Sequence, residues 1–590
     1  MRRHAALIGV MAMVAALAGT GPSPVGAQAV TDQVFAGYGS GATISLSALQ
    51  LGQTQAVNVQ AAAAGQSTFS QGLPGAGLFN ELGYIVQPAG TPGNAFGRGT
   101  GLELGLLTPD PNPDPNQILL SGLATANAPP SSGLIEREIG PISLGGLAYA
   151  SLLKGSAQAT FNPNFCPVGR PLSFGQGEAT GLQLVGSENG GGPLNNPLVG
   201  SSLPVDSNDP RNVSRTRSFT YLIPNGDGTF GVVSETRQTI APVSLLGGAI
   251  TLELLGEWAL RAIATGKPGP DGARVEYAPV GAGPTTPVVS LTIGGLPTVI
   301  TAQQLFGPGG FDTGPLLGAL SGLVELTIGT PARQLGGNGP VTDAADGTAA
   351  AGAVDVVTLK VLNLPPLLVG TNLAIGHMEA AASAPAGGVT CEIPVSKSAT
   401  PNPVVAGNDF TVTIRIPSDS GLFTELFACD LVSIRVTDEH AIESGNPSFV
   451  LTSASDGGVI GADGSTVTWD NIGNYTPGDP PIELTVRGRI PGNSGDGVLR
   501  DTANVSASLG NCEGTGEGDE VVGSVINTLS NNATIGGSIT LIGPNVSRSG
   551  VLAATGGDQG LLVLGGALLL GAVVLRRTLR PRAVRARSRD

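Results

Sequence analysis

The chain is acidic and poor in charged residues for its length. Its 590 residues include 91 glycines and 45 prolines, charged residues make up 12%, and the formal net charge is −15. This composition excludes long exposed helices stabilised by many salt bridges. A hydrophobic content of 41% argues against a chain that is disordered throughout. Residues 30–555 carry 20 basic and 42 acidic side chains, a net charge of −22 that repels phosphate backbones. No nucleic acid is therefore expected as a partner.

The amino terminus has the three parts of a secretory signal peptide. Two arginines precede the apolar stretch 5–19, and small residues stand at Ala27 and Ala29, where signal peptidase reads the chain. A membrane anchor is the alternative, but the apolar stretch is too short for a stable span and is followed by a disruptive Pro-Gly segment. Residues 1–29 are therefore expected to be removed on export.

Residues 30–388 are expected to form a large all-β surface domain, or two such subdomains. Periodic and β-branched runs predict strands at 213–223, 230–240, 252–255, 258–263, 288–293, 324–328 and 354–361. Asn225-Gly-Asp-Gly228 is a strong hairpin signal between the first two of these strands. Only 302–306 is typical of a short helix.

The following region, 391–528, has the pattern of an immunoglobulin-like β-sandwich. In the segment 410–416, apolar residues alternate with threonine and arginine, which indicates a half-buried strand. The alternation returns at 432–436, 482–487 and 501–507. An Asp463-Gly464 turn precedes a short strand at 467–469, and strands at this spacing are typical of a sandwich.

The same region resembles a conserved surface repeat, the domain of unknown function eleven. The resemblance depends on Lys397, Pro403 and the segments 407–409, 436–438 and 503–505. Members of that family are β-sandwich modules of bacterial envelope proteins that act as spacers or adhesive stalk units, and they offer no active site to transfer. This chain departs from the pattern at 416–419, where the usual asparagine is absent, and it has an extra pair of cysteines.

The carboxyl-terminal residues have the order of a membrane-retained sorting region. A linker at 529–551 is followed by the sorting signal with its tail, 552–590. Within that tail, 560–575 is expected to be a transmembrane helix, although slightly short for one. Seven arginines between Arg576 and Arg589 would hold the end of the chain in the cytoplasm by the positive-inside rule.

The pentapeptide that opens the tail resembles a known signal. Leu552, Ala553, Ala554, Thr555 and Gly556 are similar to the Leu-Pro-X-Thr-Gly signal of Gram-positive surface proteins, in the Leu-Ala-X-Thr-Gly form associated with class E sortases. The resemblance implies recognition of the first two residues, cleavage after the threonine by a sortase thiolate, and transfer to a cell-wall precursor. Alanine replaces the usual proline, and a plain membrane anchor is the alternative.

The cysteines are expected to form disulfides. Cys166, Cys391, Cys429 and Cys512 are an even number in an exported chain, and they allow three pairings. Pairs within each region, Cys166 with Cys391 and Cys429 with Cys512, are favoured because domains usually fold as units. The alternative is that some of the four remain free and buried.

Few residues suggest metal or acid–base chemistry. The predicted mature chain has two histidines, His377 and His440, and one histidine in each region does not make a zinc site. We expect His440 to lie in a loop, and His377 to be a strand residue hydrogen-bonded to its neighbour Glu379 rather than a general base.

Other motifs fail on their spacing. No Gly-x-Ser-x-Gly elbow occurs, and 265–268 lacks the glycine and the hydroxyl of a phosphate-binding loop. The segment 110–116 lacks the central glycine of a calcium loop and is expected to be a linker. An acidic cluster at Glu513, Glu517, Asp519 and Glu520 leaves calcium binding as an open alternative. No cofactor, metal or catalytic residue is predicted.

Two functional hypotheses remain. The first is a non-catalytic surface protein, anchored covalently to the cell wall, with a structural, spacer or adhesive role and an unknown extracellular ligand. The second is a wall-attached carbohydrate-active enzyme or carbohydrate-binding protein with Glu253 and Glu257 as carboxylates. A pocket that joins two carboxylates with Trp258 or Tyr221 would favour the second, whereas an aromatic content of 4% argues against it.

Overall fold

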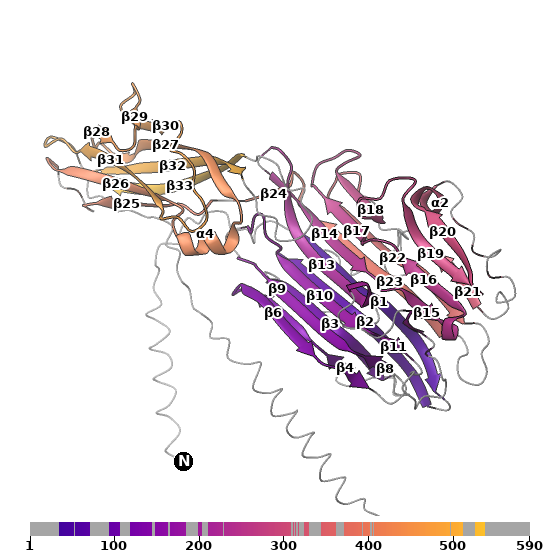
Figure 1. The fold of residues 1–590 in the computed structure, drawn as a ribbon. Coiled ribbons are helices and arrows are strands. Elements are labelled where there is room, and N and C mark those ends of the chain that lie inside the picture. The colour runs from indigo at the N-terminus through magenta and orange to yellow at the C-terminus, as the bar shows by residue number, and fades with distance from the viewer. Residues whose placement is uncertain are drawn as a thin grey trace, which may run out of the picture. The chain divides into compact units, whose positions relative to one another are not determined.

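The computed structural model describes most of residues 35–510 and residues 526–536. The longer internal gaps are 71–93, 107–117, 185–196, 203–209, 330–343, 362–370 and 511–525. In the described residues the protein consists of strands arranged in five antiparallel sheets, so the prediction of a mostly β protein is confirmed (Figure 1). No helix in these residues is long and apolar enough to cross a membrane.

Sheet 1 is built from strands at both ends of the first region. In spatial order its strands are β21 (Val324–Ile328), β22 (Ala349–Val361), β23 (Thr371–Ser383), β1 (Ala36–Leu51), β2 (Thr54–Phe69), β3 (Asn94–Leu106) and β4 (Ile118–Ser121), and β5 (Ala124–Ala128) also pairs with β3. The long central ladder pairs β1 with both β2 and β23, so residues more than 300 positions apart are neighbours.

Sheets 2 and 3 complete the first region, with the short helices α2 (Ala302–Phe306), η3 (Pro210–Asn212) and η4 (Leu246–Gly248) between their strands. Sheet 2 has the order β18 (Ala273–Pro279), β17 (Trp258–Ala264), β14 (Thr229–Thr239), β13 (Val213–Pro224), β10 (Ser173–Thr180), β9 (Leu152–Ala159) and β6 (Ser132–Ile139), with β24 (Val389–Thr390) also paired to β14. Sheet 3 has the order β20 (Leu296–Thr301), β19 (Pro287–Ile293), β16 (Ile250–Leu254), β15 (Val243–Leu245), β12 (Val199–Ser201), β11 (Gln183–Leu184), β8 (Ala148–Ala150) and β7 (Ile142–Ser143).

The predicted strands of this region are present in sheets 1, 2 and 3. The hairpin at Asn225–Gly228 joins β13 to β14, and Gly226 has a φ of 82°, as the turn requires. The predicted short helix is α2, in which the Thr301 and Gln304 side chains form a capping box. The sequence therefore predicts these elements correctly from periodicity and turn chemistry.

Sheets 1 and 2 pack face to face across an interface of small residues. A Cβ atom added to Gly99 of β3 would overlap the carbonyl oxygen of Gln176 on β10, and one added to Gly177 would overlap that of Ala63 on β2. Side chains this small allow the two backbones to approach more closely than in ordinary sheet stacking. The high glycine content is therefore used, at these positions, for close contact between sheets.

Buried polar side chains bridge the same interface. The Gln66 side chain of β2 donates from Nε2 to Ser234 Oγ (3.0 Å), and its Oε1 accepts from Ser173 Oγ (2.5 Å) and Thr220 Oγ1 (2.8 Å). All four residues are almost completely buried. Because each polar atom in this group has a partner, the hydrogen bonds offset the cost of removing it from water.

The second region consists of two sheets with one short helix, α4 (Ser420–Leu426). Sheet 4 has the order β25 (Ser396–Thr400), β26 (Asp409–Ile416), β31 (Ile482–Arg489) and β28 (Val450–Ala454). Sheet 5 has the order β29 (Val459–Ile460), β30 (Thr466–Trp469), β27 (Asp430–Gly445), β32 (Gly497–Gly510) and β33 (Ile526–Gly536). The last strand thus extends past residue 528, into residues assigned to the linker from the sequence.

The alternation predicted for this region is confirmed in its strands. On β26 the apolar residues from Phe410 to Ile416 are buried at every second position, and β31 shows the same pattern around Leu484 and Val486. Helix α4 was not predicted; its N-cap is Asp419, whose side chain accepts a hydrogen bond from the Leu422 amide (3.0 Å). Its short length gave no helical periodicity to detect.

Candidate functional site

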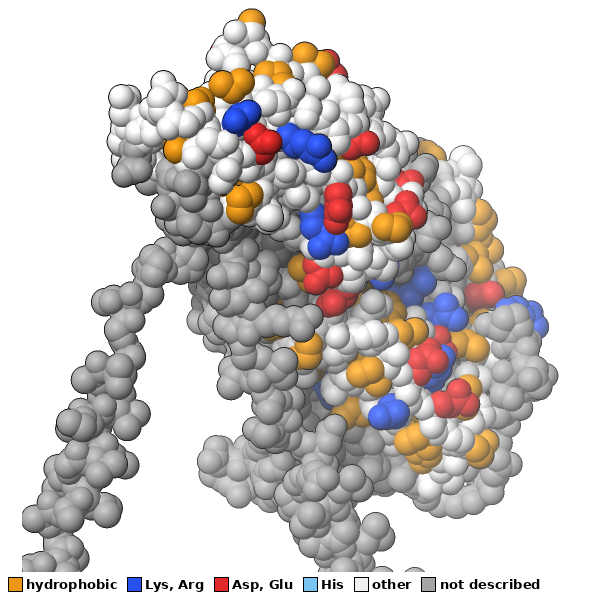
Figure 2. Space-filling model, turned by 90° about the vertical axis from the view of Figure 1, so that its left-hand side faces the viewer, with side chains coloured by type: hydrophobic (Ala, Val, Ile, Leu, Met, Phe, Trp, Pro, Cys, Tyr) orange, Lys and Arg blue, Asp and Glu red, His pale blue; other side chains and the backbone are white. Residues whose placement is uncertain are grey.

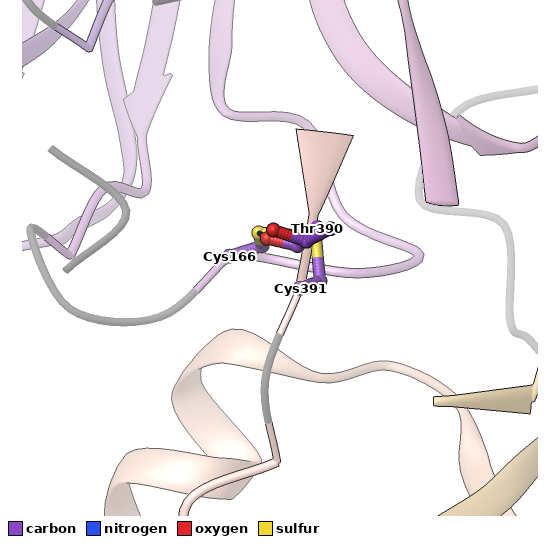
Figure 3. Close-up of a disulfide and its surroundings, with 3 residues drawn as sticks. All are labelled: Cys166, Thr390 and Cys391. Atoms are coloured by element: carbon purple, nitrogen blue, oxygen red, sulfur yellow. Dashed lines mark hydrogen bonds between the residues drawn. A yellow bond between two sulfur atoms is a disulfide. The ribbon is translucent and has the colours of Figure 1, made fainter. Parts of the chain in front are cut away.

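A disulfide bond ties a loop of the first region to the residue that follows β24. Cys166 and Cys391 are bonded, with Cα atoms 5.3 Å apart and a separation of 225 positions in sequence. Cys391 directly follows β24, and Cys166 lies on a loop beside it (Figure 3). This is the pairing favoured from the sequence, and disulfides are typical of proteins outside the reducing cytoplasm.

The second cysteine pair is only partly within the described residues. Cys429 is disulfide-bonded, and its sulfur is completely buried. Cys512, the partner favoured from the sequence, lies outside the described residues. Among the residues that the structure describes, no cysteine is free.

The second region contains a charged cluster in its core, which we call the Lys397 cluster: Lys397, Asp438, His440 and Asp501. The Lys397 ammonium of β25 donates to Oδ1 of both Asp438, on β27, and Asp501, on β32. All four side chains have an exposed fraction of 0%. The cluster joins sheet 4 to sheet 5, because its cation and its carboxyls come from different sheets.

Strand periodicity explains why these side chains point inward. On β25, Lys397 and Ala399 are buried, whereas Ser398 and Thr400 are exposed, so the lysine occupies a core position. In the ladder between β27 and β32, His440 lies opposite Asp501. The expectation that His440 lies in a loop is wrong: it is on β27, with 3% of its surface exposed.

Burial dominates the electrostatics of the Lys397 cluster. It raises the pKa of Asp501 well above the ordinary range; the charge on Asp438 adds to this effect and that on Lys397 opposes it. Burial also lowers the pKa of His440 to about 4, against the attraction of Asp438. The His440 imidazole is therefore neutral at physiological pH, and Asp501 favours its protonated form.

Three residues of the Lys397 cluster are also the group of potential metal ligands found among the described residues. Ligand atoms of Asp438, His440 and Asp501 lie within 4.8 Å of one another. The Lys397 ammonium, however, already donates to both carboxyls, so a positive charge occupies the position that a bound cation would take. The residues present therefore fit an internal ion pair better than a metal centre.

His377 belongs to a separate group on sheet 1. Its Nδ1 is 2.6 Å from Asp355 Oδ1, and its Nε2 is 2.7 Å from Glu379 Oε1, so the predicted bond to its neighbour is confirmed. Burial alone would lower the pKa of His377, but Glu379 and Asp355 outweigh it and raise the pKa to about 10. An imidazolium bonded at both nitrogens has no free lone pair with which to act as a base.

The residues proposed for carbohydrate chemistry are separated. Glu253 is on β16 of sheet 3, whereas Glu257 directly precedes β17 of sheet 2 and is ion-paired with Arg217 and Arg237. The Trp258 side chain is completely buried, and its ring lies 5.6 Å from that of Tyr277.

Tyr221 has a polar partner of its own. Its hydroxyl donates to Glu235 Oε2 (3.1 Å), and that carboxylate also pairs with Arg237 and Arg261. In this arrangement Trp258 cannot stack on a sugar, and Glu235 and Glu257 are both paired with arginines.

Several predicted sites lie outside the described residues. They are the signal-peptidase residues Ala27 and Ala29, the sorting signal 552–556, the transmembrane segment 560–575 and the acidic cluster 513–520, and the expected linker 110–116 lies outside them too. Each remains a prediction from the sequence.

The surface that Figure 2 draws is mixed in character. Lysine and arginine side chains are interspersed with aspartate and glutamate, and hydrophobic side chains are scattered singly or in small groups over the described part of this face. Such a distribution is usual for a solvated protein surface. The negative charge inferred from composition is accordingly spread out on this face.

Comparison with known proteins gives only distant likenesses. No protein-family model and no curated protein matches the chain. It is similar to the N-terminal domain of an adhesin from Streptococcus gordonii, at 9% identity and a TM-score of 0.15, covering 67% of this chain and 88% of that one. It is also similar to a Corynebacterium diphtheriae protein described as membrane anchored, at 11% identity and a TM-score of 0.12, covering 84% and 95%. Likenesses this distant establish neither a shared fold nor a shared function.

Proposed function

We propose that this chain is a non-catalytic cell-surface protein that a class E-like sortase attaches covalently to the cell wall, with a structural, spacer or adhesive role. The observation that carries the proposal is the order of features at its end. Leu552–Gly556 is followed by an uncharged apolar segment and then by seven arginines. A pentapeptide alone could arise by chance in a chain rich in alanine and glycine, whereas this order matches what sorting requires.

Features of the described residues support export and display. The disulfide between Cys166 and Cys391 fits an oxidising compartment. The order of sheet 4 is like that of the A-B-E-D sheet of an immunoglobulin sandwich, and β27, β32 and β33 are ordered like strands C, F and G. This topology agrees with the proposed likeness of region 391–528 to the domain of unknown function eleven, whose members are envelope spacers.

The carbohydrate hypothesis has less support. It needs two carboxylates beside an accessible aromatic ring, but Glu257 is bound by arginines and Trp258 is buried. The spacer or adhesive role is therefore the better proposal.

The test is the chemical state of the chain's end. Cells that produce the protein are fractionated after wall digestion, and the carboxyl-terminal peptide is identified by mass spectrometry. We expect a peptide that ends at Thr555 and is joined to a wall fragment. A membrane fraction that retains the arginine-rich tail would overturn the proposal in favour of a plain anchor.

Two variants make this test specific. Thr555→Ala removes the residue whose carbonyl the sortase attacks, so wall attachment should fall below detection while the exported body still folds. Ala554→Ser changes the free position of the signal and should leave attachment unchanged. Equal loss of attachment in both variants would contradict recognition of the pentapeptide.

A further inference from the structure

Lys397 differs from the three other lysines of the chain. Lys154, Lys267 and Lys360 each form an ion pair with a single carboxylate, and their side chains are 24%, 35% and 53% exposed. Lys397 has no exposed side-chain surface and contacts two carboxyls. One of the four lysines in the chain thus lies in the core of a β-sandwich.

An ion pair of this kind adds little stability by itself. Removing an ammonium and two carboxyls from water costs several kcal/mol for each ion, and well-packed apolar residues often stabilise a core equally well. Two acceptors of the cluster, Oδ2 of Asp438 and Oδ2 of Asp501, have no hydrogen-bond partner. The desolvation of these groups therefore costs free energy that the ion pairs alone do not fully offset.

His440 restricts the protonation of the carboxyls. Its Nδ1 lies 3.3 Å from the Ser465 carbonyl oxygen and donates to it, which leaves Nε2 as an unprotonated acceptor. Nε2 lies 3.6 Å from Asp501 Oδ1 and 3.8 Å from Asp438 Oδ2. Two ionised carboxylates beside this acceptor would repel one another, so one of them is favoured as the neutral acid. Burial and the charge of Asp438 raise the pKa of Asp501, which makes Asp501 that acid.

We propose that Lys397 and Asp501 are joined by an intramolecular amide bond, with Asp438 as the proton acceptor. Asp438 takes a proton from the Lys397 ammonium, and the neutral amine attacks Cγ of Asp501. The Nζ–Cγ bond forms, the bond from Cγ to the hydroxyl oxygen breaks, and the hydroxyl leaves as water with a second proton from the amine. Asp438 ends as a neutral acid, and no oxidant or cofactor is required.

The site favours this condensation in two ways. Fixing an amine against a carboxyl replaces a bimolecular step by an intramolecular one, for which effective molarities reach about 10⁵–10⁸ M. The reaction also removes a buried cation and a buried anion, since the products are an amide, a neutral carboxylic acid and water. Asp501 is the better electrophile of the two carboxyls because burial raises its pKa, and a protonated carboxyl can release its hydroxyl as water.

The bond would join the two sheets of the sandwich covalently. Lys397 is on β25, the first strand of this region, and Asp501 is on β32, which pairs with the last strand, β33. The linked residues are 104 positions apart in sequence. In a spacer that carries tension between its ends, such a link would prevent the sandwich from unravelling from its first strand.

Peptide mapping of the full chain tests the proposal. The protein is purified, its disulfides are reduced and alkylated, and it is denatured and digested with trypsin. We expect no cleavage after Lys397, and a branched peptide that contains Lys397 and Asp501 and weighs one water molecule less than its two parts. Linear peptides with complete cleavage after Lys397 in the wild-type chain would overturn the proposal.

Matched variants assign the roles within the cluster. Lys397→Met and Asp438→Asn should give linear peptides, the second because it keeps both bonded residues and removes only the proton acceptor. Lys360→Met changes an exposed lysine and should leave the branched peptide intact. Near-ultraviolet circular dichroism shows whether Asp438→Asn is folded. A branched peptide in folded Asp438→Asn, or one linked through position 438 in the wild type, would contradict the assigned roles.

Discussion

The two regions join their sheets by opposite means. Between sheets 1 and 2 the contact is made by glycine, alanine, serine and threonine, and Gln66 hydrogen-bonds across it. Between sheets 4 and 5 the contact is made by large apolar side chains such as Phe410 and Leu484, with one charged cluster among them. A β protein low in aromatic residues can therefore build a core either from close backbone approach or from the packing of large apolar side chains.

Overpacking the close interface should have the largest effect. Gly99→Val would place side-chain atoms on the Gln176 carbonyl, where backbone atoms on both sides leave no room. We expect a loss of more than about 4 kcal/mol, seen as failure of the first region to fold in circular dichroism and limited proteolysis. Gly133→Val, at a strand position with no neighbour within 4 Å, is the matched control and should fold. Similar behaviour of the two variants would disprove close packing.

Removing the lysine of the Lys397 cluster should have the next largest effect. If the amide bond is present, Lys397→Met opens a covalent loop of 104 residues, and chain entropy predicts a loss of roughly 4–5 kcal/mol. Thermal unfolding of the second region, followed by the fluorescence of Trp469, measures it. Unchanged unfolding would show that the cluster contributes no more than a replaceable ion pair.

Breaking the polar bridge of the first region should cost less. Gln66→Leu leaves Ser173, Thr220 and Ser234 without their amide partner, so we expect a loss of roughly 2–4 kcal/mol in urea unfolding. Gln303→Leu, on the exposed face of α2, should change stability by less than about 0.5 kcal/mol. A neutral or stabilising effect of Gln66→Leu would mean that this interface tolerates an ordinary apolar core.

A pH titration should give the smallest effect. The pKa of His377 is about 10 in the folded chain, above the value of roughly 6.5 for an unfolded histidine. The stability it contributes is therefore complete below pH ~6.5 and is lost as the pH rises towards 10. The urea midpoint of the first region should fall between pH 7 and 9.5, and it should fall less in His377→Gln. Parallel curves for both proteins would contradict the raised pKa.

Strand prediction succeeded where large side chains alternate. The segments 213–223, 230–240 and 410–416 were recognised because their apolar residues recur with a period of two. Strands β1 and β2 were not, since their glycine, alanine and serine residues carry weak β propensity. They form strands because segments distant in sequence pair with them. Local β propensity contains no information about such pairing.

The candidate sites divide in the same way. The pairing of Cys166 with Cys391 could be favoured from domain organisation, and His377 was correctly placed beside Glu379 because both lie on one strand. The Lys397 cluster was missed as a site. In the sequence, Lys397 and Asp438 stand out only through a family resemblance, and a loop is expected at His440 although β27 continues through it.

The amino-acid sequence alone is enough to predict the strand-rich composition, the turns and the signals expected at both ends, because these depend on residues close together in the chain. The tertiary structure decided which polar residues leave water. From the sequence, a lysine at an inward strand position only interrupts the alternation of apolar and polar residues. The tertiary structure shows that two carboxyls from the opposite sheet contact it. Burial then changes both its energy and its chemistry, and burial depends on contacts between residues more than a hundred positions apart.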